Sequence, residues 1–201
     1  MLNRISKFAF GLLMLALFVT SISEAQTKKT IYPVFSISPI AGVQFPIGGL
    51  NDNYGPSWNA GLEVALAINR ETSFFLNGTY YNMPRKSDAV AGPDASYIGI
   101  TAGPRYVFTS PKVKAKFFLE AGVGVYMYTR KEYTTVTTPS VVVPSESTTN
   151  FGVNVGPGAI IPLGEVADLV IKTKVHYSFE SGGSGGSRTF VAAVIGVDFK
   201  L

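Results

Sequence analysis

The sequence predicts an all-β fold of eight antiparallel strands that follow one another along the chain. Eight segments alternate apolar with polar side chains, as strands with two unlike faces do. Each segment reaches the roughly 9–11 residues that cross a bilayer at a tilt. Long and short connections alternate between the segments. Together these features predict an up-and-down sheet that closes into a barrel.

Turn-forming residues separate the eight segments. We expect strands at 34–45, 58–68, 73–82, 96–108, 116–131, 150–161, 169–180 and 191–201. The long connections are 46–56, 83–95, 132–149 and 180–187, and the short ones are 69–72, 109–115 and 162–168. Transmembrane barrels pair longer outer loops with short periplasmic turns in this way, and an even number of strands brings both termini to the turn side.

The N-terminus indicates export. Arg4 and Lys7 precede an apolar run at 8–19, and small residues lead to Ala25. This pattern predicts a cleavable signal peptide at 1–25. The apolar run is shorter than the roughly 20 residues of a spanning helix, which disfavours the alternative of an N-terminal anchor. We expect a short periplasmic lead at 26–33 and a barrel domain at 34–201.

Charge and cysteine content narrow the function classes. The chain carries 17 basic and 13 acidic residues, and removal of 1–25 leaves 15 and 12. The resulting net charge of +3 is too mild to indicate nucleic-acid binding. No cysteine is present, which excludes disulfides and a lipid anchor on cysteine.

The sorting of charges distinguishes a soluble barrel with an apolar core from a membrane barrel with a polar lumen. The apolar faces carry no charge, as expected where Lys or Arg facing mid-bilayer would cost about 2–4 kcal/mol. Acids and bases share the other faces, and in a narrow lumen they would have to pair. The predicted lumenal network comprises Glu63, Arg105, Glu120, Lys172, Lys174, His176, Glu180, Asp198 and Lys200. We therefore expect a transmembrane β-barrel in the bacterial outer membrane.

Aromatic residues near strand ends predict two belts at the membrane interfaces. The predicted girdle comprises Trp58, Tyr81, Tyr106, Phe108, Phe117, Tyr128, Phe151, Tyr177, Phe179 and Phe199. Three prolines within strands oppose this regular picture, because proline cannot donate to the ladder. We expect Pro39, Pro104 and Pro157 each to mark a bulge or a missing bond.

The last residues resemble the C-terminal assembly signal of bacterial outer-membrane barrels. Gly196 precedes two apolar residues at alternate positions, Phe199 and Leu201, although Phe is the commoner final residue. With the signal peptide and eight segments, the chain resembles the small OmpA-like and OmpX-like outer-membrane barrels. The resemblance implies insertion by the outer-membrane assembly machinery, with outer-membrane lipid and lipopolysaccharide as neighbours.

Motifs for catalysis, phosphate binding or metal ligation do not occur in the sequence. His176 shares a face with Ser178 and Glu180, as a lipid A-modifying enzyme would require. That face is expected to point into the lumen, whereas a lipid substrate approaches from outside. We therefore predict no catalytic residue, no metal and no cofactor.

Three functions remain open. The first is a monomeric structural or surface-interaction protein, plugged by its own salt bridges, with an extracellular partner at its loops. The second is a small porin-like channel, which the narrow interior of an eight-stranded barrel disfavours. The third is the lipid A-modifying enzyme.

Overall fold

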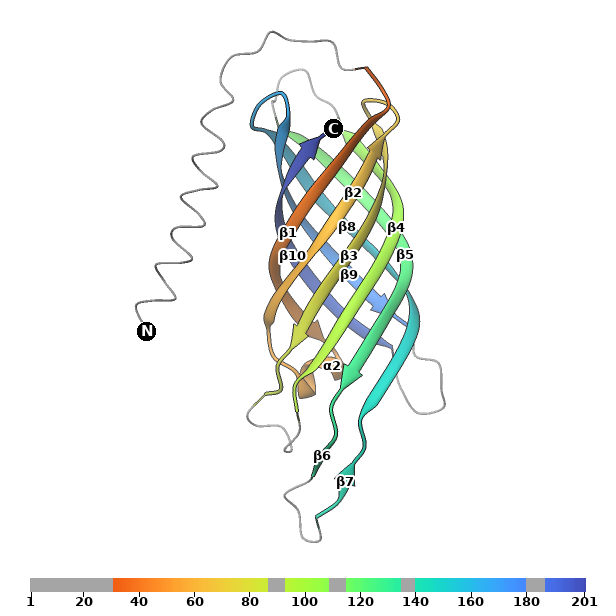
Figure 1. Ribbon diagram of the computed structural model, residues 1–201, viewed down its shortest axis with the longest axis vertical. Coiled ribbons are helices and arrows are strands. Elements are labelled where there is room, and N and C mark those ends of the chain that lie inside the picture. The colour runs from red at the N-terminus through yellow and green to blue at the C-terminus, as the bar shows by residue number, and fades with distance from the viewer. Residues whose placement is uncertain (1–30, 87–92, 109–114, 135–139, 180–186) are drawn as a thin grey trace, which may run out of the picture.

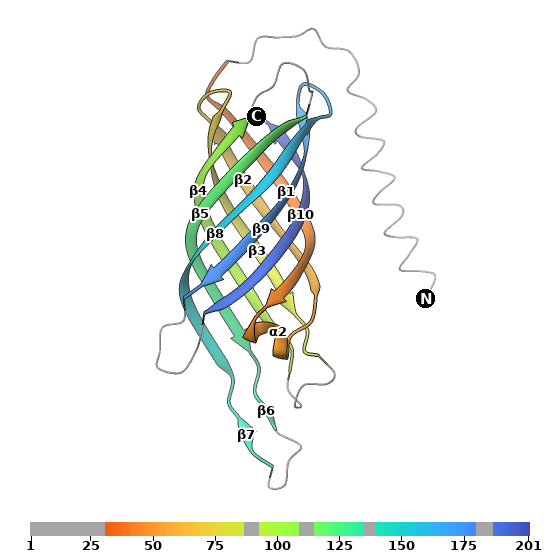
Figure 2. The same ribbon diagram turned by 180° about the vertical axis from the view of Figure 1, so that it is seen from behind.

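The computed structural model describes residues 31–86, 93–108, 115–134, 140–179 and 187–201. Eight long antiparallel strands close into a barrel in the order β1-β10-β9-β8-β5-β4-β3-β2 (Figures 1 and 2). They are β1 (Val34–Ile47), β2 (Ser57–Ala67), β3 (Thr72–Met83), β4 (Ala95–Phe108), β5 (Lys116–Arg130), β8 (Glu146–Pro162), β9 (Ala167–Ser178) and β10 (Arg188–Lys200). Each strand pairs with its neighbours along the chain, and β1 pairs with β10 to close the wall. The predicted eight-stranded antiparallel barrel is confirmed. The signal peptide and most of the periplasmic lead lie outside the described residues.

Two expected loops contain regular structure. The helical turn α2 (Gly49–Asn53) lies in the connection between β1 and β2. Between β5 and β8, the short strands β6 (Tyr133–Thr134) and β7 (Val142–Val143) extend the hairpin beyond the barrel (Figure 1). Pairing of Arg130 with Glu146 starts β8 four residues earlier than expected. A five-residue helix and a Thr-, Ser- and Val-rich hairpin lack the long alternation that identifies strands in a sequence.

The two ends of the barrel differ. The C-terminus and the connections from β2 to β3 and from β8 to β9 lie at one end, here called the turn end; α2 and the β6–β7 hairpin lie at the other, called the loop end (Figure 2). The connection from β2 to β3 is tight because the Asn69 side-chain oxygen accepts hydrogen bonds from the amides of Glu71 and Thr72, at 2.9 and 2.8 Å. Such side-chain bonds replace a backbone turn and keep the connection short.

Burial alternates along the strands: the outward side chains are mostly apolar, and the inward ones combine polar and charged groups with buried aromatic rings. In β9, Lys172 and Lys174 are buried, whereas Ile171 and Val175 are exposed by 45% and 42%. Exposing the outward apolar side chains to water would be costly, at about 25 cal/mol for each Å² of apolar surface. The wall therefore has the polarity of a barrel surrounded by lipid. Across the described ranges, no helix is long and apolar enough to span a membrane.

The three prolines expected to disturb the strands interrupt the ladder without shifting it. At Pro39 the pairing of β1 with β10 stops after Ile37↔Phe199 and resumes at Ile40↔Gly196 in the same register. Pro104 and Pro157 lie in matching gaps between β4 and β5 and between β8 and β9. Each proline remains paired on its other side. The expected disturbance is therefore a local loss of bonds and not a bulge.

Candidate functional site

The middle of the lumen holds a cluster of five charged side chains from four different strands. Glu63 comes from β2, Arg105 from β4, Glu120 from β5, and Lys172 and Lys174 from β9. All five are inward-facing and no more than 4% exposed. Successive side chains of a strand point to opposite faces. Whether a charged residue lies in the lumen therefore depends only on whether it shares the inward-facing alternate positions of its strand. We call these five residues the charge cluster.

Arg105 links the two acids of the charge cluster. A terminal nitrogen of its guanidinium lies 2.5 Å from Glu63 Oε1 and 2.5 Å from Glu120 Oε2, and its Nε donates to Glu120 Oε2 at 2.8 Å. Lys172 donates to Glu63 and lies 3.3 Å from Glu120 Oε1. Lys174 Nζ lies 2.7 Å from Glu120 Oε1. Every charge thus has an opposite charge within bonding distance, and the three bases exceed the acids by one.

Two inward-facing aromatic rings lie against cations of the charge cluster, and sequence reasoning missed their role. The Arg105 guanidinium lies 4.5 Å from the centre of the Phe118 ring, and Lys174 Nζ lies 4.1 Å from that of Phe75. A cation over a ring face is stabilised, more so when water is excluded. Alternation could have shown this placement, because Phe75 and Phe118 share the inward face with Asn77 and Glu120.

His176 lies one step toward the loop end, fixed by aromatic neighbours. Its Nδ1 is 2.9 Å from the Tyr126 hydroxyl and its Nε2 is 3.4 Å from that of Tyr81. The imidazole stacks on Phe190 at 4.6 Å and 9°. Both ring nitrogens therefore face tyrosine hydroxyls in a site closed to solvent. Glu180, the acid considered for a catalytic group, lies outside the described residues.

The remaining predicted network residues lie apart from the charge cluster, near the turn end. Asp198 accepts a hydrogen bond from Ser38 Oγ at 2.5 Å. Lys200 Nζ pairs with Asp168 at 2.9 Å, and its side chain is 32% exposed. The single network expected from the sequence is therefore divided into a central cluster and separate contacts at the rim.

The girdle prediction was wrong for two residues. Tyr81 and Tyr128 point into the lumen and are 3% and 2% exposed. Each shares the inward face of its strand, Tyr81 with Thr79 and Tyr128 with Glu120, so closeness to a strand end was a misleading signal. The other predicted girdle residues lie on the outer wall: Trp58, Tyr106, Phe108, Phe117, Phe151, Tyr177, Phe179 and Phe199.

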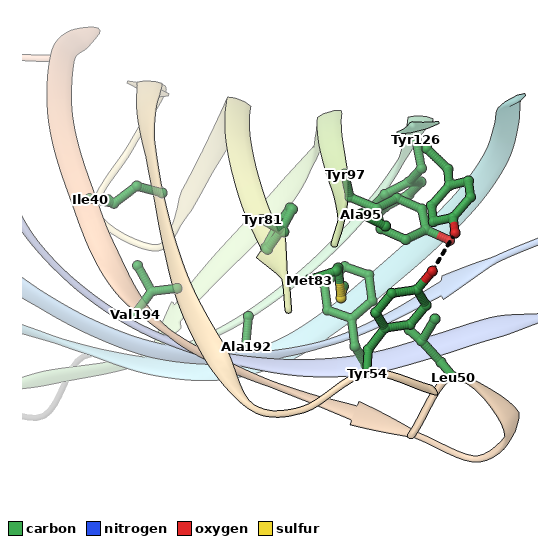
Figure 3. Close-up of a cluster of buried hydrophobic side chains, with 12 residues drawn as sticks. Ile40, Leu50, Tyr54, Tyr81, Met83, Ala95, Tyr97, Tyr126, Ala192 and Val194 are labelled. Atoms are coloured by element: carbon green, nitrogen blue, oxygen red, sulfur yellow. Dashed lines mark hydrogen bonds between the residues drawn. The ribbon is translucent and has the colours of Figure 1, made fainter. Parts of the chain in front are cut away.

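Side chains and α2 together cover the loop end of the lumen. Leu50 and Tyr54 point from the α2 segment into the barrel, toward Met83 (Figure 3). The Tyr54 and Tyr128 hydroxyls are 2.7 Å apart, and Arg188 lies 3.9 Å above the Tyr128 ring. A backbone hydrogen bond also holds this segment to the end of β3, because the amide of Gly55 donates to the Pro84 carbonyl.

The three residues of the predicted assembly signal lie on the strand that closes the barrel. Gly196 faces inward opposite Ile40, Phe199 faces outward opposite Ile37, and the amide of Leu201 donates to the carbonyl of Phe35 at 2.9 Å. Recognition by assembly machinery stays a prediction. Among the residues that the structure describes, no group of three acidic or histidine side chains could hold a metal ion.

Solved structures with the same fold are small bacterial outer-membrane barrels. Neisserial surface protein A superposes with a TM-score of 0.60 at 14% identity, over 86% of this chain and all of that chain. The N-terminal barrel domain of Pseudomonas aeruginosa OprF gives 0.56 at 14% identity, over 84% and 98%. OprG from the same organism gives 0.53 at 11% identity, over 84% and 96%. No protein-family model matches the chain, and a search of curated proteins finds no similar sequence.

Proposed function

We propose that this barrel, which has the fold of small bacterial outer-membrane proteins, is a monomeric structural and surface-interaction protein with a closed lumen. The observation that carries the proposal is the charge cluster, which spans the lumen from β2 to β9. Eight strands enclose a space that side chains alone can fill. A solute would have to separate paired charges to pass, and each separated buried charge costs several kcal/mol.

Apolar layers on both sides of the charge cluster support a closed lumen. Toward the turn end, Val107, Phe118 and Val170 pack together. Toward the loop end, Tyr97 and Phe190 are fully buried. These layers keep water from the charge cluster, which strengthens its ion pairs and raises the cost of opening them.

The loop end offers the surface on which a partner would bind. The β6–β7 hairpin projects past the barrel, with Val141 and Val142 exposed by 54% and 60% (Figure 1). At its base, the guanidinium groups of Arg85 and Arg130 lie 5.8 and 5.5 Å from the Tyr133 ring. The hairpin continues β5 and β8 beyond the barrel, so the barrel serves as the scaffold on which a binding loop would be held.

Conductance across a planar bilayer tests the closed lumen. Refolded wild-type protein is expected to show no steady open state at the single-channel level. Replacing residues 48–55 with a short Gly-Ser linker is also expected to leave the barrel closed, because the charge cluster lies below α2. A combined Glu63→Ser, Arg105→Ser and Glu120→Ser variant removes these ion pairs while the apolar layers remain, and it is expected to show brief openings that wild type lacks. A steady open state of wild type would instead support the porin-like alternative.

The proposal assigns His176 to the lining of the lumen and not to catalysis. The imidazole is 2% exposed, and the lipid-facing wall separates it from any acyl chain outside. Mass spectrometry of lipid A from cells with and without the gene should show the same acyl chains. A gene-dependent change in acylation would revive the enzymatic alternative.

A further inference from the structure

Three arginines lie over the loop end of the lumen, at positions that continue the inward-facing alternation of their strands. Arg130 ends β5, two residues after the buried Tyr128, and Arg188 begins β10. Arg85 follows β3, two residues after the buried Met83. They come from three parts of the wall that surround the opening, and we call Arg85, Arg130 and Arg188 the mouth arginines.

Two of the mouth arginines hold one carboxylate between them. Glu146 of β8 lies with its Oε2 atom 3.2 Å from a nitrogen of Arg130 and with its Oε1 atom 3.2 Å from a nitrogen of Arg188. A guanidinium suits a carboxylate because it presents several charged donors in one plane. This arrangement shows which kind of group the mouth of the barrel binds: an oxyanion held by cations from different strands.

Arg85 pairs with no acidic side chain among the residues that the structure describes. Asp94 accepts a hydrogen bond from the backbone amide of Arg85 at 2.9 Å and not from its guanidinium. The Tyr133 ring lies 5.8 Å from the guanidinium carbon of Arg85 and 5.5 Å from that of Arg130, so the two cations are at most about 11 Å apart. The Nε atoms of both arginines are shielded from solvent and have no hydrogen-bond partner, which is costly for a charged donor.

We infer that the mouth arginines bind an acidic polysaccharide outside the cell, with one acidic group of the chain at Arg85 and the next at Arg130. The spacing supports a polymer, because neighbouring cations at most about 11 Å apart suit acidic groups that repeat along one chain. Glu146 already occupies the side of Arg130 that faces Arg188, so the ligand adds its charge on the side of Tyr133. The inference rests on the proposed surface role and names the class of partner for it.

The headgroups of membrane lipid are less suited to this position. Arg130 pairs in the ladder with Ala95 and Glu146, which lie on the inward-facing alternate positions of β4 and β8. Lipid headgroups surround the outer wall, and one held by its acyl chains would have to bend over the rim to reach Arg85. A soluble chain approaches the mouth from the loop end without that constraint.

A slender chain also fits this position better than a folded protein. The β6–β7 hairpin extends past the mouth on one side (Figure 1), and a typical protein interface needs about 800 Å² on each partner. Polar side chains around the mouth can meet the hydroxyls of a sugar. Thr148 lies on the same face of β8 as Glu146, and Lys86 Nζ donates to Asn51 Oδ1 at 3.0 Å beside Arg85.

Binding of alginate oligosaccharides, in which every sugar carries a carboxylate, tests the inference on refolded protein in detergent. Wild type is expected to bind alginate, more weakly as salt rises, and not to bind neutral dextran. Arg85→Gln is expected to weaken alginate binding about tenfold, because it removes a charged donor group from the site. Arg70→Gln is the matched control and should bind as wild type does, because Arg70 lies between β2 and β3 at the turn end.

Glu146→Gln tests the same site in the opposite direction. Loss of this carboxylate releases donors of Arg130 and Arg188 to the ligand, so alginate should bind about threefold more tightly. Glu165→Gln removes the same charge from the connection between β8 and β9 at the turn end and should leave the affinity unchanged. The shift in gel mobility on boiling verifies that each variant has folded.

Other outcomes of these measurements would overturn the inference. Equal alginate affinities of wild type and Arg85→Gln would show that the mouth arginines do not form the site. Polyglutamate bound as tightly as alginate would reject a polysaccharide in favour of an acidic peptide. Lipid A retained by wild type and lost by Arg85→Gln would assign the site to lipopolysaccharide phosphate. A wild type that binds no alginate yet stays closed in planar bilayers would reject the inference alone, because conductance tests the closed lumen separately.

Discussion

At the scale of single residues, Arg105 holds the lumen together because its planar guanidinium can serve two carboxylates at once. Glu63 and Glu120 approach it from different strands, and each receives a charge-assisted hydrogen bond. Lys172 and Lys174 supply point charges at the edges of this arrangement. A lysine in place of Arg105 could not reproduce the fork, so the two cations are not interchangeable here.

Loss of Arg105 should destabilise the barrel much more than loss of Lys200, which lies outside the charge cluster. Arg105→Met leaves Glu63 and Glu120 buried with reduced compensation, and breaking such a pair costs about 3–5 kcal/mol. Urea unfolding of refolded protein in detergent measures the difference. Lys200→Met is the control, because its pair with Asp168 is partly exposed and should contribute about 0–1 kcal/mol. Equal midpoints for the two variants would contradict a stabilising role for the charge cluster.

The inward charges were predictable residue by residue, but their grouping was not. Alternation placed Glu63, Arg105 and Glu120 in the lumen from sequence alone. Which of these charges meet depends on strand stagger around a closed wall, and no local pattern encodes it. Asp198 and Lys200 consequently lie near the turn end, away from the cluster with which they were grouped.

At the scale of elements, the strands were predictable because lipid and lumen impose opposite demands on their two faces. The expected segments overlap all eight strands, with ends that differ by up to four residues. The α2 turn has too few residues to show a helical period, and its burial depends on contacts with β1 and β10 that arise only in the folded barrel. The strands can therefore be predicted from the sequence, whereas the covering of the loop end by α2 cannot.

A charge on the outer face of the barrel, halfway along a strand, should impair insertion into the membrane. Leu76 lies in the middle of β3 and is 55% exposed to the membrane, so Leu76→Lys should cost about 2–4 kcal/mol. The fraction of protein that shifts on a gel when unboiled reports insertion into liposomes. Val142→Lys serves as the control, because Val142 is similarly exposed but lies on the β7 strand beyond the barrel. An undiminished inserted fraction for Leu76→Lys would mean that this face does not meet lipid.

At the scale of the whole molecule, closure depends on the seam between the first and last long strands. β1 and β10 are farthest apart in the sequence yet pair from Ser36↔Lys200 to Ile47↔Thr189. Sequence pattern gives an even number of strands but says nothing of how closely these two backbones approach. The structure supplies that information at Gly42, where a Cβ atom would lie 1.9 Å from the Ala193 carbonyl oxygen.

Gly42→Ala should therefore oppose closure of the barrel, although it adds a single methyl group. The new carbon meets backbone of β10 and not a movable side chain, so the seam must open locally, at a cost of about 1–3 kcal/mol. Gly78→Ala is the matched control, since a Cβ at Gly78 meets nothing within 4 Å on the outer face of β3. Refolding yield and urea midpoint should fall for Gly42→Ala and stay at the wild-type value for Gly78→Ala. Wild-type stability of both variants would show that the seam tolerates separation, and closure would then depend on the lumenal ion pairs more than on the ladder between β1 and β10.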